Sequence, residues 1–324
     1  MKLSIVIVCW NELTVIRDCL SSIYSGTHST EFEVIVTDNG SVDGSVQFIQ
    51  GTFPGVRVIE NGENLGFAKA NNVGFLASSG EYILILNPDT IVHEGALDEW
   101  VRFADQHPEA GGFGCHVLNG DDSFQPTAEP FPTVWRYWIW ALCWHPLAYF
   151  VDMFVPYSYS HWKGGTERQI DWHWGCCLMV RGDLLKRLGA FDERLSYWCQ
   201  DVDLCHRIWD AGHSILYAPK VTITHLGGLP QGRCGLWFQL EKYRNLYHYF
   251  HKYYGNRGAR QFRHIALVYL WARRLEWELL QRVRPTEEGR KRREIYRVCT
   301  EWNKRLDPIL FVQEAAEPKV DTPS

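Results

Sequence analysis

The sequence lacks a long uninterrupted hydrophobic run, a glycine-rich phosphate loop near its N-terminus and a Gln-x-x-Arg-Trp motif. Without that motif and spanning helices, a processive membrane-embedded polysaccharide synthase is not expected. Without the phosphate loop, a nucleotidyltransferase is disfavoured as well. The chain also has no Cys-x₂-Cys pair and no paired histidines to accompany its 10 cysteines, so a structural zinc site is not expected.

The cysteines are scattered along the chain, and two of them, Cys176 and Cys177, are adjacent. This distribution is typical of reduced thiols in a cytoplasmic protein. The first residues, Met1–Leu3, lead directly into an apolar segment, which predicts that no signal peptide is present. With 324 residues, the chain can form one large domain with an appendage, or two domains.

Four short apolar segments in the first part of the chain each end at a polar cluster. They span residues 3–9, 32–37, 56–59 and 82–86, and segments with the apolar spacing of helices lie among them. Strands that alternate with helices predict right-handed crossovers and a parallel sheet. Because ligands bind at the carboxyl edge of such sheets, the polar clusters predict one shared site.

Asn87-Pro88-Asp89 follows the last of these segments and places an amide and a carboxylate at the predicted carboxyl edge. Such oxygen ligands suit a hard cation, Mg²⁺ or Mn²⁺, which in turn suits a diphosphate. Asn, Pro and Asp also form turns, so a plain strand-ending turn explains the motif equally well when it is taken alone. The other strand-ending clusters favour the ligand site.

Further candidates for chemistry lie in the second half of the chain. Asp201 and Asp203 open a predicted helix, where an aspartate caps free N–H groups and complements the helix dipole. That explanation suits one of the two, and the other could act as a general base that deprotonates a hydroxyl. His225 ends a predicted strand; a lone histidine is usually structural, but this position also makes it a candidate metal ligand.

Residues 257–305 hold 14 lysines and arginines against 6 acidic residues, a balance of +8 in a chain of net charge −5. Apolar residues recur there at helical spacing, which fits either a helix packed on the body or one lying on an anionic membrane. Nucleic acid is not an expected partner, because no binding motif is present.

A Trp-rich segment at 131–154 is interrupted by Arg136, His145 and Asp152, so it predicts an interfacial or acceptor-facing loop rather than a spanning helix. Packing in the core, or a lid over the site, is the alternative for this segment.

Taken in order, the motifs resemble the inverting family 2 glycosyltransferases of the GT-A fold, and most of all their rhamnosyltransferase branch. The resemblance covers roughly residues 1 to 230, and the ordered series is far more specific than any single motif. The matching segments are 4–12, 36–41 with 43–45, 64–68, 86–89, 174–177, 189–193, 200–204 and 225–228. The resemblance implies an α/β fold, namely a Rossmann-like, mostly parallel sheet with flanking helices, followed by a C-terminal helical extension.

The resemblance also implies roles for individual residues. Asp38 would hydrogen-bond a pyrimidine base, Asp89 would bind a divalent metal with His225 as a further ligand, and Asp201 would be the catalytic base. The whole nucleotide-sugar site would comprise Cys9, Asn11, Glu12, Asp38, Asn64, Lys69, Asn87 and Asp89. The donor-sugar and acceptor pocket would be shaped by Trp174, Tyr197 and Trp198. Two positions depart from the family pattern, because Asn87 replaces an Asp and Gln200 replaces a Glu.

The implied function is metal-dependent, inverting transfer of L-rhamnose from dTDP-L-rhamnose in cell-surface polysaccharide synthesis, with Mg²⁺ or Mn²⁺ as cofactor. The acceptor would be a hydroxyl of a glycan or polyprenyl-linked saccharide, and the enzyme would lie on the anionic inner face of the cell membrane. A UDP-hexose or another donor is the alternative. A non-catalytic membrane scaffold is a further alternative, which the presence of Asp38, Asp89 and Asp201 disfavours.

The predicted domain organisation has four parts. Residues 1–90 would form the nucleotide-sugar-binding half of the GT-A domain, and residues 91–250 its acceptor-binding and catalytic half. Residues 251–311 would form the basic helical extension, which either associates with a membrane or packs on the body, and residues 312–324 a disordered tail. The oligomeric state is not predicted by any of these features.

Overall fold

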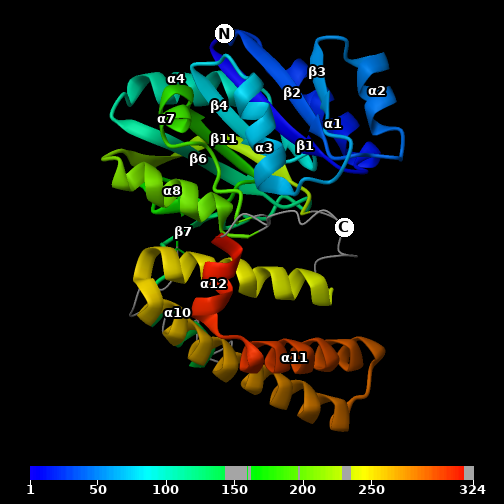
Figure 1. Ribbon diagram of the computed structural model, residues 1–324. Helices are drawn as coiled ribbons and strands as arrows, with labels where there is room; N and C mark the ends of the chain where they lie inside the picture. The colour runs from blue at the N-terminus through cyan, green and yellow to red at the C-terminus, as the bar shows by residue number, and fades with distance from the viewer. Residues whose placement is uncertain (143–158, 160–161, 196–197, 228–234, 317–324) are drawn as a thin grey trace, which may run out of the picture. The chain divides into compact units, whose positions relative to one another are not determined.

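A computed structural model describes residues 1–142, 159, 162–195, 198–227 and 235–316 (Figure 1). The described residues separate into two compact units. One unit, the sheet unit, contains residues 1–131 and 159–227, and the other, the helical unit, contains residues 132–142 and 235–316.

The sheet unit is built on a nine-stranded sheet with the order β3-β2-β1-β4-β10-β6-β11-β5, and β8 pairs with β11. Strands β3, β2, β1 and β4 are parallel, β10 is antiparallel between β4 and β6, and β11 is parallel to β6. The predicted α/β class with a mostly parallel sheet is therefore confirmed. The strands are β1 (Leu3–Cys9), β2 (Phe32–Asp38), β3 (Val56–Glu60), β4 (Tyr82–Leu86), β5 (Thr90–Val92), β6 (Ala110–Leu118), β8 (Arg168–Gln169), β10 (Cys177–Arg181) and β11 (Ser214–His225). A separate antiparallel pair is formed by β7 (Ala128–Glu129) and β9 (Trp172–His173).

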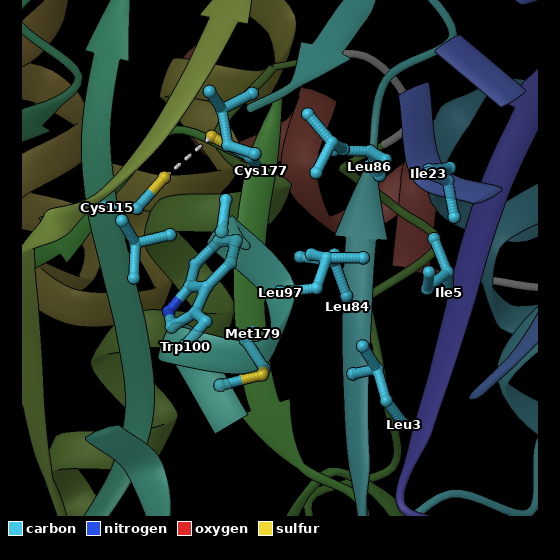
Figure 2. Packing of buried hydrophobic residues seen from close by; sticks show 14 of the residues in the cluster. Leu3, Ile5, Ile23, Leu84, Leu86, Leu97, Trp100, Cys115, Cys177 and Met179 are labelled. Carbon is cyan, nitrogen blue, oxygen red and sulfur yellow. Dashed lines mark hydrogen bonds between the residues drawn. The ribbon is translucent and has the colours of Figure 1, made fainter. Parts of the chain in front are cut away.

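Helices cover both faces of this sheet, so its central strands are apolar on both sides. They are α1 (Leu13–Gly26), α2 (Ser45–Thr52), α3 (Phe67–Ala77), α4 (Ala96–Gln106), α7 (Gly182–Arg187) and α8 (Gln200–Asp210). Alternate side chains of β1, β4, β10 and β11 enter two separate clusters, as the period of a strand requires. Figure 2 shows one of them, in which Trp100 and Leu97 of α4 lie against Leu84 and Met179 of the sheet.

The helical unit consists of α5 (Val134–Leu142), α10 (Leu236–Val283), α11 (Glu287–Arg305) and α12 (Pro308–Ala316). The long helix α10 is kinked at Gly255, where φ is 65° and ψ is −165°, a conformation that only glycine adopts readily. Aromatic rings form the core: Phe250 and Phe262 stack with centroids 4.8 Å apart, and Tyr137 of α5 meets both edge-on. Part of the Trp-rich segment is therefore a helix of this core, and residues 143–158 lie outside the described residues.

The boundary predicted at 250 and the predicted tail need correction. The two predicted halves of the GT-A domain lie largely in one unit, because the sheet joins strands from residues 1–90 and from residues 91–250. The boundary predicted at 250 falls inside α10, since a continuous helix leaves no linker there. The tail predicted from 312 is wrong for residues 312–316, which continue α12 with Val312 only 6% exposed. Residues 317–324 lie outside the described residues.

Candidate functional site

The carboxyl end of β2 holds a buried carboxylate with one unsatisfied oxygen. Asp38 is 3% exposed, and its Oδ2 accepts hydrogen bonds from the N–H groups of Gly40 (3.0 Å) and Ser41 (2.9 Å). Among the described residues, no donor lies within hydrogen-bond distance of the buried Oδ1. Leaving such an oxygen unpaired costs about 1–3 kcal/mol. A ligand N–H that approached Oδ1 would remove this cost.

The end of β1 lies beside Asp38, because Cys9 and Asp38 are paired in register. Burial raises the pKa of the Cys9 thiol to about 11, so this side chain is uncharged and is not a nucleophile. Asn11 has a φ of 57°, and its Oδ1 accepts a hydrogen bond from the Val42 N–H at 2.8 Å. Glu12, half-buried, directly precedes α1. These predicted site residues therefore meet at the ends of two neighbouring strands.

The loops after β2 and β3 are joined by an asparagine that the sequence motifs did not single out. Asn39 Nδ2 donates to Asn64 Oδ1 (3.2 Å) and to the Gly66 carbonyl (3.3 Å), while its Oδ1 accepts from Asn61 (2.9 Å). The predicted phosphate-side residue Asn64 is thus held next to the Asp38 loop. Lys69 is exposed on α3, and its contact with phosphates stays a prediction.

The ends of β4 and β11 bring together the residues predicted to bind metal. His225 Nε2 lies 3.3 Å from Asp89 Oδ1 and 3.5 Å from Asn87 Nδ2, and both His225 and Asp89 are buried. The backbone N–H of Leu226 donates to the Asp89 carbonyl at 2.9 Å, which fixes the two strand ends together. The structure thus brings Asp89, Asn87 and His225 together, and metal binding by Asp89 and His225 stays a prediction.

A glutamine that the motifs missed holds the imidazole of His225. Gln125 Oε1 lies 2.8 Å from His225 Nδ1, and Gln125 Nε2 donates to Asn119 Oδ1 at 2.6 Å. Because the amide oxygen only accepts, His225 Nδ1 carries the proton and Nε2 of the neutral ring keeps a lone pair. That lone pair and the carboxylate of Asp89 face one another, a donor set that fits Mg²⁺ or Mn²⁺.

Asp201 lies in the first turn of α8. Its Oδ2 accepts the Gly175 N–H at 3.0 Å and its Oδ1 accepts the Val202 N–H at 2.8 Å. Burial nevertheless raises the pKa of this carboxyl above its ordinary value of 3.8. A carboxylate with a raised pKa is a stronger base, which suits proton abstraction. The neighbouring Gln200 is 8% exposed, and its buried Oε1 has no hydrogen-bond partner among the described residues.

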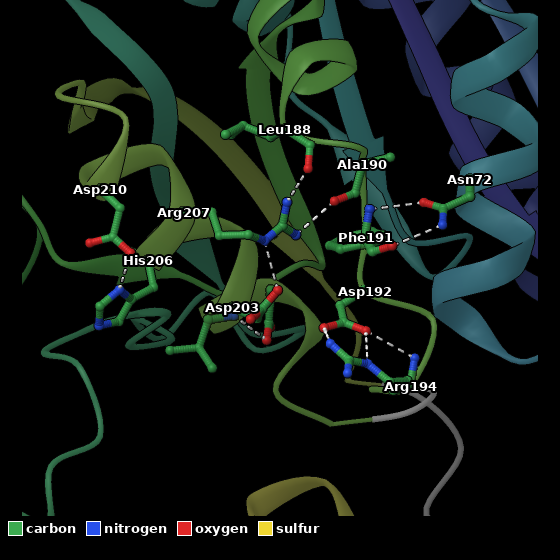
Figure 3. Close-up of polar contacts among 12 residues, drawn as sticks. Asn72, Leu188, Ala190, Phe191, Asp192, Arg194, Asp203, His206, Arg207 and Asp210 are labelled. Carbon is green, nitrogen blue, oxygen red and sulfur yellow. Dashed lines mark hydrogen bonds and ion pairs between the residues drawn. The ribbon is translucent and has the colours of Figure 1, made fainter. Parts of the chain in front are cut away.

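The second carboxylate of this helix, Asp203, has a structural role. It is fully buried, and its Oδ2 accepts a hydrogen bond from Arg207 Nε at 2.9 Å (Figure 3). The same guanidinium donates to the carbonyl oxygens of Leu188 (2.9 Å) and Ala190 (2.7 Å), so it ties α8 to the preceding turn. The two aspartates therefore differ, since Asp203 forms an ion pair with an arginine, whereas backbone N–H groups hold the carboxylate of Asp201.

The aromatic residues predicted to shape the sugar pocket are only partly described. Trp174 is half-buried, and its Nε1 donates to Glu129 Oε1 at 3.1 Å. Trp198 is 38% exposed and lies just before α8. Tyr197 lies outside the described residues. The pocket role of all three stays a prediction.

A second group with metal-binding side chains lies deep in the sheet core. Cys115, His173 and Cys177 are fully buried, with their ligand atoms within 4.8 Å of one another. Burial lowers the pKa of His173 to about 4, so the ring is neutral. Its Nδ1 lies 3.0 Å from the Trp174 carbonyl and its Nε2 lies 2.8 Å from Thr127 Oγ1. Both nitrogens are thus engaged, and this geometry favours a satisfied core histidine over a metal ligand.

Comparisons with known proteins agree with this geometry. The family model "Glycosyl transferase family 2" matches residues 4–175. An N-acetylglucosaminyl-diphospho-decaprenol L-rhamnosyltransferase of Mycobacterium tuberculosis is 30% identical over 218 residues, which cover 62% of this chain and 68% of that protein. The rhamnosyltransferase WbbL of Escherichia coli K12 is 23% identical over 209 residues, which cover 60% of this chain and 72% of the relative.

Solved structures resemble the chain in fold. The mannosyltransferase PcManGT from Pyrobaculum calidifontis, in complex with GDP-Man and Mn²⁺, matches with a TM-score of 0.56 and 18% identity, over 97% of this chain and 86% of that one. GalNAc-T7 with UDP, GalNAc and Mn²⁺ matches with a TM-score of 0.59 and 13% identity, over 98% of this chain and 58% of that one. At these identities the likeness concerns the fold alone.

Proposed function

Because the chain belongs to glycosyl transferase family 2, we propose that it transfers L-rhamnose from dTDP-L-rhamnose, with inversion, to a hydroxyl of a glycan or polyprenyl-linked saccharide. The observation that carries this proposal is the set of groups at the carboxyl edge of the sheet. An unsatisfied carboxylate oxygen of Asp38, the facing pair Asp89 and His225, and the buried carboxylate Asp201 belong to one unit. The names of two relatives as rhamnosyltransferases support the choice of sugar.

Donor recognition would begin at Asp38. Its free Oδ1 would accept the ring N–H of a thymine or uracil base, and Cys9 and Asn11 would line the same position. The hydrogen bonds to Gly40 and Ser41 hold the carboxylate in place before the ligand arrives, which lowers the entropy lost on binding. Glu12 would lie toward the ribose. The remaining nucleotide-side candidates are Asn64, Lys69 and Asn87.

Asp89 and His225 would hold a divalent cation on the donor diphosphate, with Asn87 beside them. When bound, Mg²⁺ or Mn²⁺ supplies positive charge that stabilises the departing diphosphate. The chain's own contribution is orientation, since Gln125 fixes the ring of His225 and the Leu226 N–H fixes the Asp89 backbone. The lone pair of Nε2 and the Asp89 carboxylate are therefore arranged before the ion arrives.

Asp201 would take the proton from the acceptor hydroxyl as that oxygen attacks the anomeric carbon. The attack comes from the face opposite the diphosphate, so a single displacement inverts the configuration and no covalent nucleophile is needed. A β-linked rhamnosyl donor would give an α-linked product. The raised pKa of Asp201 favours this proton transfer, and the Gly175 N–H keeps one carboxylate oxygen oriented. Trp174, Tyr197 and Trp198 would shape the pocket for the sugars.

The proposed location of the enzyme is the inner face of the cell membrane, where a lipid-linked acceptor would be held. The positive charge of residues 257–305 supports this location. No helix within the described part of the chain is both long and apolar enough to cross a bilayer. A UDP-hexose donor remains the second candidate, because the groups at Asp38 suit uracil as well as thymine.

The experiment that tests the proposal measures nucleotide release by the purified full chain from dTDP-rhamnose and from UDP-sugars, with Mn²⁺, Mg²⁺ or a chelator. We expect metal-dependent release of dTDP, and loss of turnover with retained donor binding in Asp201→Asn. Turnover of a UDP-sugar alone would refute rhamnose as the donor sugar. If no donor were bound or turned over, the proposed function would be wrong.

A further inference from the structure

The second half of α10 carries apolar side chains on two opposite sides, and only one side is covered. Phe262 and Leu270 are at most 1% exposed and belong to the buried side. On the other side, Trp271, Leu275 and Leu279 are 64%, 42% and 51% exposed. A helix that merely packs on its neighbours has one apolar face and polar residues opposite it. The exposed apolar side of α10 therefore needs an explanation beyond the fold of the helical unit.

Trp271, Leu275 and Leu279 follow one another at intervals of four residues, so they form a single stripe along about 12 Å of helix. We call these residues the outer stripe. Helix α11 contacts a different side of α10, where the Arg292 guanidinium lies over the Trp277 ring at 5.1 Å from its centroid. Figure 1 shows α11 running beside this half of α10. The packing of α11 thus leaves the outer stripe exposed.

Cationic residues border the outer stripe. Arg274 adjoins it, Arg260 lies on the same side three turns earlier, Arg282 lies in the last turn of α10, and Arg284 directly follows that helix. Glu278 lies 3.9 Å from Arg282 and offsets only part of this charge. An apolar centre within a positive border is complementary to an anionic lipid surface, where Trp favours the headgroup level.

We propose that the outer stripe and its arginine border are the surface by which this enzyme binds an anionic membrane. The inference rests on the proposed function, because a lipid-linked acceptor would be held in the same bilayer. A second copy of the chain would fit the outer stripe less well than an anionic membrane does. Two identical copies joined through their outer stripes would bring Arg274 and Arg282 of each close to those of the other, and like charges repel.

The test is co-sedimentation of the full chain with vesicles of phosphatidylcholine, with and without phosphatidylglycerol. A variant combining Trp271→Gln, Leu275→Gln and Leu279→Gln should lose at least about tenfold in affinity for the anionic vesicles. Arg274→Gln with Arg282→Gln should lose roughly fivefold per arginine, and added salt should weaken the wild type in the same way. The matched control is Leu76→Gln with Leu310→Gln, residues 88% and 57% exposed, which should bind like the wild type.

Three results would overturn the proposal. The first is a wild type that sediments equally with neutral and anionic vesicles or with neither. The second is a stripe variant that binds as tightly as the wild type, and the third is a control that loses as much affinity as the stripe variant. Light scattering on the same proteins adds another test, because a wild-type dimer that the stripe variant converts to a monomer would assign the stripe to a second copy. Circular dichroism is expected to show the same melting temperature for all variants, since the substituted side chains are exposed.

Donor hydrolysis without acceptor separates this inference from the proposed function. The stripe variant should release dTDP from dTDP-rhamnose at the wild-type rate, because the outer stripe belongs to the helical unit and the proposed catalytic groups belong to the sheet unit. A wild type that binds anionic vesicles through the stripe but hydrolyses no donor would count against the transferase proposal alone. A wild type that hydrolyses the donor but ignores vesicles would count against the membrane surface alone.

Discussion

Replacing Gln125 by leucine tests how the proposed metal ligand His225 is oriented. In the wild-type chain the Nδ1–H of His225 donates to Gln125 Oε1 at 2.8 Å, and Asn119 fixes the glutamine amide. Leucine has a similar size but cannot accept a hydrogen bond. The Nδ1–H would then be left unpaired, or the proton would move to Nε2, which is the atom that faces Asp89.

The expected size of the effect follows from these contacts. A proton on Nε2 removes the lone pair that a cation needs, and loss of such a supporting partner typically lowers metal affinity about 10- to 100-fold. This range corresponds to about 1.4–2.8 kcal/mol of binding free energy. An unpaired N–H in a residue only 4% exposed should also lower the free energy of unfolding by about 1 kcal/mol.

The assay is titration of the full chain with Mn²⁺ in the presence of dTDP, followed by calorimetry or by the electron paramagnetic resonance of free Mn²⁺. Gln125→Glu is the matched control, because its carboxylate still accepts the Nδ1–H, and its Mn²⁺ affinity should stay within a few-fold of the wild type. If Gln125→Leu were folded and bound Mn²⁺ as tightly as the wild type, either His225 would not be a ligand or Gln125 would not orient it.

Further predictions concern catalysis and stability. Because burial raises the pKa of Asp201 above its ordinary value of 3.8, kcat/KM of the wild type should fall as the pH is lowered through that raised pKa; a pH–rate profile without any acidic limb over the range in which the protein stays folded would contradict the assignment. Arg207→Leu leaves the fully buried Asp203 without its cation and should lower the unfolding free energy by about 3–5 kcal/mol in denaturant titrations, and the added change Asp203→Asn should restore part of it. Trp100→Ala, at a fully buried core position, should cost about 3–5 kcal/mol in the same assay, and a loss below about 1 kcal/mol would contradict the packing in Figure 2.

The positions of the main strands and of several site residues could be predicted from the sequence, because they depend on local patterns. Alternating apolar strands and amphipathic helices define the parallel sheet, and its geometry brings the ends of β1 and β2 together. The sequence alone therefore predicts that Asp38 and Asn11 lie close together. The pairing of Asp89 with His225 came from the resemblance to a family, since 136 residues separate them in the chain.

The remaining features depend on contacts between distant segments, which local patterns do not encode. Gln125 has no motif, and its role follows only from the register that places its loop against the end of β11. The different roles of Asp201 and Asp203 depend on Arg207, which binds Asp203 and the carbonyl groups of the turn before α8. The boundary expected at 250 is wrong because α10 begins at Leu236 and is first interrupted at Gly255, and no change in composition marks its beginning.

The most direct test of the central claim is a crystal structure of the full chain with dTDP and Mn²⁺, using the anomalous signal of manganese. The account predicts one manganese ion coordinated by both Asp89 and His225. It also predicts that the thymine N–H donates a hydrogen bond to Asp38 Oδ1 and that Asp201 lies near the open side of the diphosphate. A manganese ion bound elsewhere, or a nucleotide that leaves Asp38 Oδ1 without a partner, would contradict the proposed transferase site.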